Sequence, residues 1–92
     1  MNNKTIITVV GKDSVGIIAK VCTYLAEKQI NILDISQTIV AGNYFNMMMV
    51  VDREKATVSF GDMADDLQKV GEGIGVSIKC QLEEIFDSMH RI

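Results

Sequence analysis

The chain has 92 residues, of which 48% are hydrophobic, and it carries a formal net charge of −3. This length fits one small domain over residues 1–92, with a core expected over 4–82. The lysines and arginines are scattered and no long apolar run is present, which argues against nucleic-acid binding, a membrane-spanning segment and a secretory signal.

A strand followed by an amphipathic helix is predicted at the start of the chain. Residues 4–10, KTIITVV, are rich in β-branched side chains and end at Gly11. Asp13 or Ser14 can cap a helix that begins near Val15. Apolar residues then recur with helical period, so this helix is expected to pack on a sheet. The residues expected on its apolar stripe are Ile17, Ile18, Val21, Cys22, Leu25 and Ala26.

The middle of the chain is predicted to form a β-hairpin. Residues 30–41 alternate between apolar and polar side chains, which is typical of a strand with one wet face. The apolar side chains expected in the core are those of Leu33, Ile35 and Ile39. Gly42 and Asn43 suit a tight turn of type II′, and residues 44–51 form the return strand. Three consecutive methionines in this strand are expected to fill both of its faces.

The second half repeats the pattern of helix and strand. Thr57 or Ser59 can cap a helix whose stripe comprises Phe60, Met63, Ala64, Leu67, Val70 and Ile74. Glycines at 71, 73 and 75 are expected to end it. Residues 76–82, VSIKCQL, alternate cleanly as a half-buried strand, and residues 83–92 suit a short tail helix.

The order of elements, β-α-β-β-α-β, predicts a ferredoxin-like α/β (α+β) sandwich. Such a fold has a four-stranded antiparallel sheet with two helices on one face, and its second strand is outermost. Cys22 and Cys80 are far apart in sequence and are expected to be buried, reduced thiols. A cytoplasmic location fits this cysteine usage best.

Catalytic chemistry is poorly supported by the sequence. His90 is the single histidine, and no P-loop, dinucleotide-binding or nucleophile-elbow motif is present. No metal site and no cofactor are expected. A small acylphosphatase-like hydrolase would need an arginine in the first loop to hold phosphate, and Lys12 is the cation there. We therefore expect a protein that is not an enzyme.

The loop between the first strand and the first helix is the candidate binding site. Backbone N–H groups at a helix N-terminus favour an anion, and Asp13 could accept hydrogen bonds from an ammonium group. Asn31 begins the second strand and can both donate and accept. A purely structural interpretation stays open, in which Asp13 caps the helix, Gly16 eases packing and Asn31 shapes a turn.

The sequence resembles the ACT domain family over residues 4–82. The matching residues are Gly11, Asp13, Gly16, Ile17, Ile18, Asn31 and Ile32. The resemblance implies a regulatory module that binds an amino acid or a related small metabolite, usually as a homodimer with ligands between two copies. The chain is similar to small free-standing ACT proteins and to the glycine-cleavage regulator family, which act as metabolite sensors or as adaptors of a regulated protein partner.

The resemblance also implies the site residues. They are Gly11, Lys12, Asp13, Ser14, Val15, Gly16, Ile17, Asn31, Ile32 and Leu33. Asp13 would hold the ligand amino group, the N–H groups of residues 15–17 its carboxylate, and Asn31 of a second subunit would complete the site. Many members have Arg-Pro where this chain has Ser14-Val15. An interaction module with a vestigial ligand site is therefore the alternative. A valine in place of Gly16 is expected to obstruct the ligand with a modest effect on stability.

Overall fold

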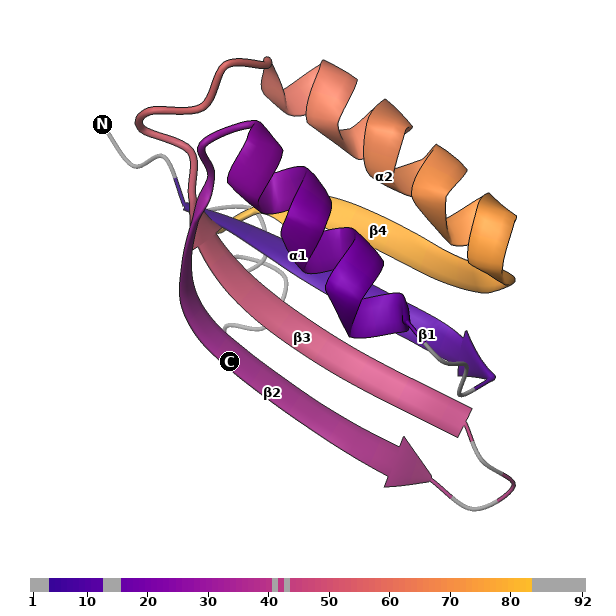
Figure 1. Cartoon of the computed structure of the whole chain (residues 1–92). Coiled ribbons are helices and arrows are strands. Elements are labelled where there is room, and N and C mark those ends of the chain that lie inside the picture. The colour runs from indigo at the N-terminus through magenta and orange to yellow at the C-terminus, as the bar shows by residue number, and fades with distance from the viewer. Residues whose placement is uncertain (1–3, 13–15, 41, 43, 84–92) are drawn as a thin grey trace.

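The computed structural model of the chain describes residues 4–12, 16–40, 42 and 44–83, and the order of elements within them is the predicted one (Figure 1). The elements are β1 (Lys4–Lys12), α1 (Ile17–Glu27), β2 (Asn31–Val40), β3 (Tyr44–Asp52), α2 (Phe60–Ile74) and β4 (Val76–Leu82). Apart from Glu83, the predicted tail helix lies outside the described residues. Ala41 and Asn43 of the predicted turn also lie outside them. Gly42 has a positive φ of +85°, as the predicted turn requires.

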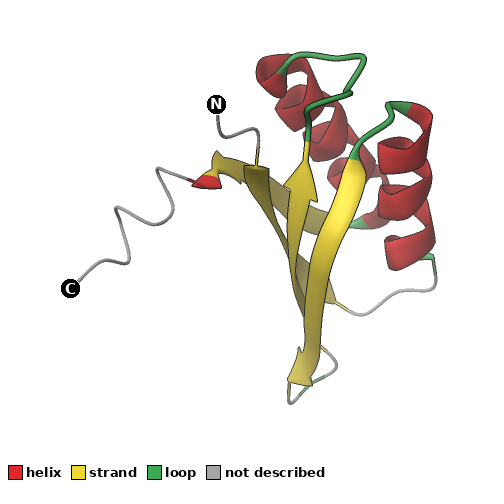
Figure 2. Cartoon of the chain, turned by 90° about the vertical axis from the view of Figure 1, so that its left-hand side faces the viewer, coloured by secondary structure: helices red, strands yellow, loops and turns green. Residues whose placement is uncertain are grey.

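The sheet has four strands in the order β2-β3-β1-β4, and every neighbouring pair is antiparallel. Both helices lie on one side of it, and no element that the structure describes covers the other side (Figure 2). This is the ferredoxin-like arrangement that the sequence predicted, with β2 at one edge and β4 at the other.

The core lies between the helix layer and the sheet. Its buried members include Ile7, Val9, Ile17, Val21, Leu25, Phe45, Met47, Met49, Val51, Met63, Leu67 and Ile78. Full burial of one such aliphatic side chain stabilises the fold by roughly 1.5–3 kcal/mol. Met48 points to the opposite face and is 38% exposed, so the methionines fill both faces of β3 as expected.

Helix α2 has well-defined ends. The Ser59 side chain accepts a hydrogen bond from the Asp62 N–H at 3.1 Å, and Gly75 ends the helix with a φ of +78°. The expectation that Gly71 and Gly73 end the helix is wrong, because both lie inside it. At Gly71 a Cβ would lie 2.6 Å from the carbonyl oxygen of Val76, so this glycine lets α2 approach β4 closely.

The expectation that Leu33, Ile35 and Ile39 lie in the core is wrong. Their side chains are 45%, 41% and 59% exposed. Ile35 pairs with Met49 and Ile39 with Phe45, so both point to the helix side of the sheet, but β2 is an edge strand that the helices do not cover. At Leu33 a β-bulge shifts the register.

The apolar stripe of α1 is narrower than predicted. Val21 and Leu25 are buried, whereas Ile18 is 37% exposed and Ala26 is also exposed. Helical periodicity puts Ile18 on a different flank of α1 from Tyr24, whose hydroxyl contacts Asp66 of α2. The flank of α1 away from α2 is the one nearer β2 (Figure 1). We refer to Ile18, Ile35 and Ile39 together as the β2 edge patch. This apolar surface is open at the edge of the sheet.

Candidate functional site

The predicted site loop joins β1 to α1. Gly11 and Lys12 end the strand, and Gly16 and Ile17 begin the helix, while residues 13–15 lie outside the described residues. The residue at the N-cap position is Gly16, with a φ of +90°. The predictions that Asp13 or Ser14 occupies this position and that the helix begins near residue 15 are therefore wrong.

The start of α1 differs from that of α2. Gly16 has no side chain with which to cap the helix, and no acidic residue lies in the first turn. The first backbone bond runs from the Lys20 N–H to the Gly16 carbonyl at 2.9 Å, which leaves the N–H groups of residues 17–19 without a partner in the described part of the chain. In α2 the cap and an acidic residue are supplied by Ser59 and Asp62. The positive end of α1 is thus the one suited to an anion.

The N–H groups at the start of α1 overlap in part with the predicted donors. The sequence places the carboxylate-binding N–H groups at residues 15–17, and the N–H groups of the first turn that have no acceptor among the described residues belong to residues 17–19. Gly11 has a packing role, because a Cβ there would lie 2.8 Å from the Val76 side chain. Lys12 is exposed at the end of β1.

Asn31, Ile32 and Leu33 begin β2 at the other end of the sheet. Asn31 pairs with Asp52, and Asp52 pairs with Lys4 at the start of β1. The site loop follows the last residue of β1. Nine residues of strand therefore separate the two halves of the predicted site, roughly 27 Å at 3.3–3.4 Å per residue. One copy of the chain does not bring them together.

Asn31 lines a polar cavity of about 330 Å³ that the sequence analysis did not find. The other lining residues are Gln29, Asp52, Glu54 and Lys55. Asp52 Oδ1 accepts a hydrogen bond from the Glu54 N–H at 2.9 Å, and Gln29 has a left-handed φ of +58°. Amide and carboxylate oxygens of this kind can accept hydrogen bonds from an ammonium group. The pairing of the hairpin ends was the signal that could have placed Asp52 beside Asn31.

Tyr24 of α1 is held against α2 by its hydroxyl group. The hydroxyl donates a hydrogen bond to Asp66 Oδ2 at 2.6 Å. Burial, then this bond and the Asp66 charge, hold the pKa of the Tyr24 phenol well above its ordinary value. The hydroxyl therefore stays protonated and remains a donor at neutral pH.

The two cysteines are half-buried, so the expectation of full burial is wrong. Burial raises the pKa of the Cys80 thiol to about 11, and the nearby Arg53 charge acts in the opposite direction. Arg53 Nε donates a hydrogen bond to Thr5 Oγ1 at 2.7 Å, and the guanidinium lies 5.2 Å from the Phe60 ring centroid. A protonated thiol is a poor nucleophile, so Cys80 is not suited to nucleophilic catalysis at neutral pH.

Metal ligands do not gather among the described residues: no three His, Cys, Asp or Glu side chains there lie close enough to hold an ion. In the same part of the chain, neither helix has the length and apolar character needed to cross a membrane.

Comparison with known proteins gives consistent matches over nearly the whole chain. A family model described as ACT domain matches residues 3–81. A UPF0237 protein of Bifidobacterium longum is 62% identical over 90 residues, which are 98% of this chain and 99% of that protein. An ACT domain protein from Streptococcus pneumoniae is 41% identical, with a TM-score of 0.80 over 98% of this chain and 100% of that one. The ligand-free regulatory subunit of aspartate kinase from Thermus thermophilus shares the fold at 24% identity, with a TM-score of 0.68 over 90% of this chain and 53% of that one.

Proposed function

Since this chain belongs to the ACT domain family, we propose that it is a regulatory protein that binds an amino acid or a closely related small metabolite. The observation that carries this proposal is the start of α1, where Gly16 leaves room and the N–H groups of the first turn are free in the described part of the chain. A ligand carboxylate placed there would accept hydrogen bonds from these groups and interact favourably with the helix dipole. Asp13 would bind the ligand amino group.

The working form is a homodimer joined along β2. Exposed edge strands invite pairing, and the β2 edge patch would bury apolar surface in such an interface. In an antiparallel pairing of two identical strands, the start of one strand lies beside the end of the other. The end of β2 adjoins Tyr44 of β3, which pairs with Lys12 of β1, so it lies near the site loop. The partner subunit's Asn31 would therefore approach the site loop of the first subunit. Within a single subunit, Asn31 and the site loop lie roughly 27 Å apart.

Each ligand would then contact both subunits. The loop of one subunit would supply the anion-binding N–H groups, and the polar cavity beside the partner's Asn31 would receive the rest of the ligand. Ile32 and Leu33, which follow Asn31 in β2, would lie in the interface. Binding at such a site would stabilise the dimer, because the complete site exists only when two subunits are paired.

The proposed role is regulation of another protein, in the cytoplasm, without catalysis by this chain. Support comes from the family and from the UPF0237 and ACT domain relatives, which match this chain over nearly their whole length. The regulatory subunit of aspartate kinase shows that the fold occurs in a protein named for regulation. Whether the chain acts as a sensor or as an adaptor, the proposed result is the same: the activity of a protein partner changes.

Thermal unfolding in the presence of each of the twenty amino acids tests the proposal. A ligand at a hundredfold excess over its Kd stabilises the folded state by about 2.7 kcal/mol, which for a domain of this size raises Tm by roughly 10 °C or more. We expect the Tm of the dimer to rise with one amino acid or with a small group of related amino acids. If no amino acid changes Tm at millimolar concentration, the proposal is wrong and an interaction module with a vestigial site is the better interpretation.

A further inference from the structure

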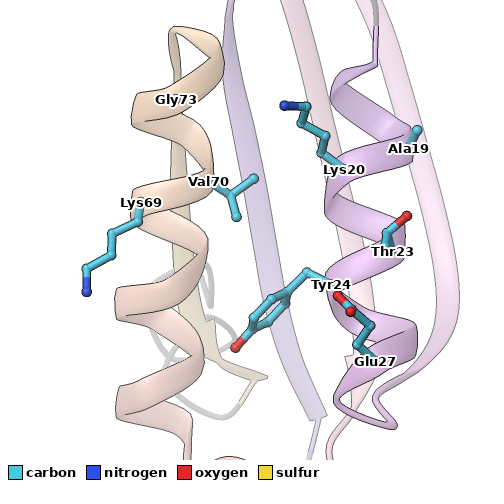
Figure 3. Close-up of a pocket in the computed structure, with 8 residues that line it drawn as sticks. All are labelled: Ala19, Lys20, Thr23, Tyr24, Glu27, Lys69, Val70 and Gly73. Atoms are coloured by element: carbon cyan, nitrogen blue, oxygen red, sulfur yellow. The ribbon is translucent and has the colours of Figure 1, made fainter.

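A groove lies between α1 and α2, on the surface that faces away from the sheet (Figure 3). Its volume is about 440 Å³, and it shares no described lining residue with the cavity beside Asn31. The lining residues are Ala19, Lys20, Thr23, Tyr24, Glu27, Lys69, Val70 and Gly73. Along each helix they recur at intervals of three or four residues, so one flank of each helix forms one wall.

The groove is open where the facing residues are small and closed where Tyr24 crosses it. A Cβ added at Gly73 would meet no heavy atom within 4 Å, so the space above this residue is free. At the other end the Tyr24 hydroxyl is bonded to Asp66 of α2, and the Lys28 ammonium lies 5.9 Å from the ring centroid. The Tyr24 ring, which forms the aromatic wall of the groove, is thus held by its hydroxyl group and lies near the Lys28 ammonium. Such a groove is preformed and does not require rearrangement to accept a ligand.

The charges of the groove are separated along its length. Figure 3 shows Lys20 extending from α1 toward α2 at the open end, with Val70 pointing toward α1 beside it. Lys20 forms no ion pair with any residue that the structure describes. Glu27 lies two turns further along α1, about 10 Å from Lys20 at 1.5 Å per residue. Lys69 lies on the outer rim and points away from the groove.

We propose that this groove is a second ligand site and that it binds a small organic anion with an aryl or branched aliphatic body. The anionic group pairs with the Lys20 ammonium at the open end, where none of the described lining residues carries a carboxylate. The apolar body lies over Gly73 and against Val70 and the Tyr24 ring, which gives it both an aliphatic and an aromatic contact. Glu27 at the closed end repels a second negative charge, so the site favours a monoanion.

Titration of the isotope-labelled protein with 3-phenylpropionate, followed by amide chemical shifts, tests the site. We expect saturable shifts at Ala19, Lys20, Thr23, Val70 and Gly73. Two probes serve as controls: 3-phenylpropylamine keeps the aryl body but is a cation, and propionate keeps the carboxylate but lacks the body. Both are expected to bind at least about fivefold more weakly. Absence of saturable shifts with 3-phenylpropionate, equal binding of the amine, or shifts confined to the β1–α1 loop would overturn the proposal.

Variants separate the groove from general effects of charge and stability. Lys20→Met is expected to weaken 3-phenylpropionate binding about fivefold, whereas Lys79→Met, which removes an exposed lysine of β4 on the open face of the sheet, leaves it unchanged. Gly73→Leu fills the groove and abolishes the shifts, while the helix tolerates leucine better than glycine. Gly61→Leu, at an equally open position of α2 outside the groove, is the matched control. Unchanged binding by Gly73→Leu would show that the anion binds elsewhere.

Discussion

Replacing Gly16 by alanine measures how much the start of α1 depends on its left-handed backbone. The φ of +90° at Gly16 costs a residue with a Cβ about 1–2 kcal/mol. The lower entropy of alanine in the unfolded chain offsets about 0.4–1 kcal/mol of this. No heavy atom lies within 4 Å of the added Cβ, so no clash contributes. We expect Gly16→Ala to lower the free energy of unfolding by about 1 kcal/mol. The expectation of a modest effect for Gly16→Val is wrong for the same reason, since β-branching adds to the strain.

Gly61→Ala is the control, because Gly61 is equally free of neighbours but lies in the first turn of α2 without a positive φ. Alanine there is expected to stabilise the protein by about 0.5–1 kcal/mol. The two variants should therefore differ in Tm by roughly 10 °C, at about 4–8 °C per kcal/mol. Urea and thermal unfolding at one fixed protein concentration measure both values. Equal stabilities of Gly16→Ala and Gly61→Ala would refute the left-handed conformation at the start of α1.

Other perturbations test the packing, the interface and the thiol. Tyr24→Phe removes the hydrogen bond to Asp66 and is expected to lower the free energy of unfolding by about 0.5–1.5 kcal/mol in urea titrations; no loss would mean that the bond is not formed in solution. Ile39→Asp places a charge on the β2 edge patch, and sedimentation equilibrium is expected to show monomers with an unchanged circular dichroism spectrum; a persistent dimer would place the interface elsewhere. Cys80 is expected to react slowly with a thiol reagent at pH 8 and faster as pH approaches 11, whereas rapid labelling at neutral pH would contradict its burial. Because the pKa of Cys80 is raised above its ordinary value of 9.0, its contribution to stability is complete below pH 9 and is lost as pH rises through about 11.

The elements and their order follow from periodicity in the sequence. Strand β4 was predicted with its observed bounds, 76–82, because apolar and polar residues alternate through it without interruption. The mistaken core assignment of Ile35 and Ile39 shows the limit of this reasoning. Alternation predicts which side chains share a face of a strand, and here it did so correctly, but it does not say whether another element covers that face.

The sequence suggests which residues to consider for a site, but it does not give their arrangement in space. The spacing of Gly11, Gly16 and Asn31 matches the family, yet the distance between loop and Asn31 depends on the length and direction of β1, which joins opposite ends of the sheet. The φ of Gly16 was also beyond prediction, because glycine at a helix start is compatible with several backbone conformations. The groove beside Tyr24 depends on how two helices pack, and the periodicity within each helix carries no information about the gap between them.

The strand order has a consequence for how the chain folds during synthesis. Of the four strands of this sheet, β1 comes first along the chain. Because β1 lies between β3 and β4, it is paired on both sides only when β4, the last of the four, is in place. Until residues 76–82 leave the ribosome, one edge of β1 has no partner from its own chain. Its sequence, TIITVV, is apolar and β-branched, which is the kind of segment that pairs with other copies and nucleates aggregates. Within this sheet, the strand that is synthesised last, β4, thus protects the strand that is synthesised first, β1.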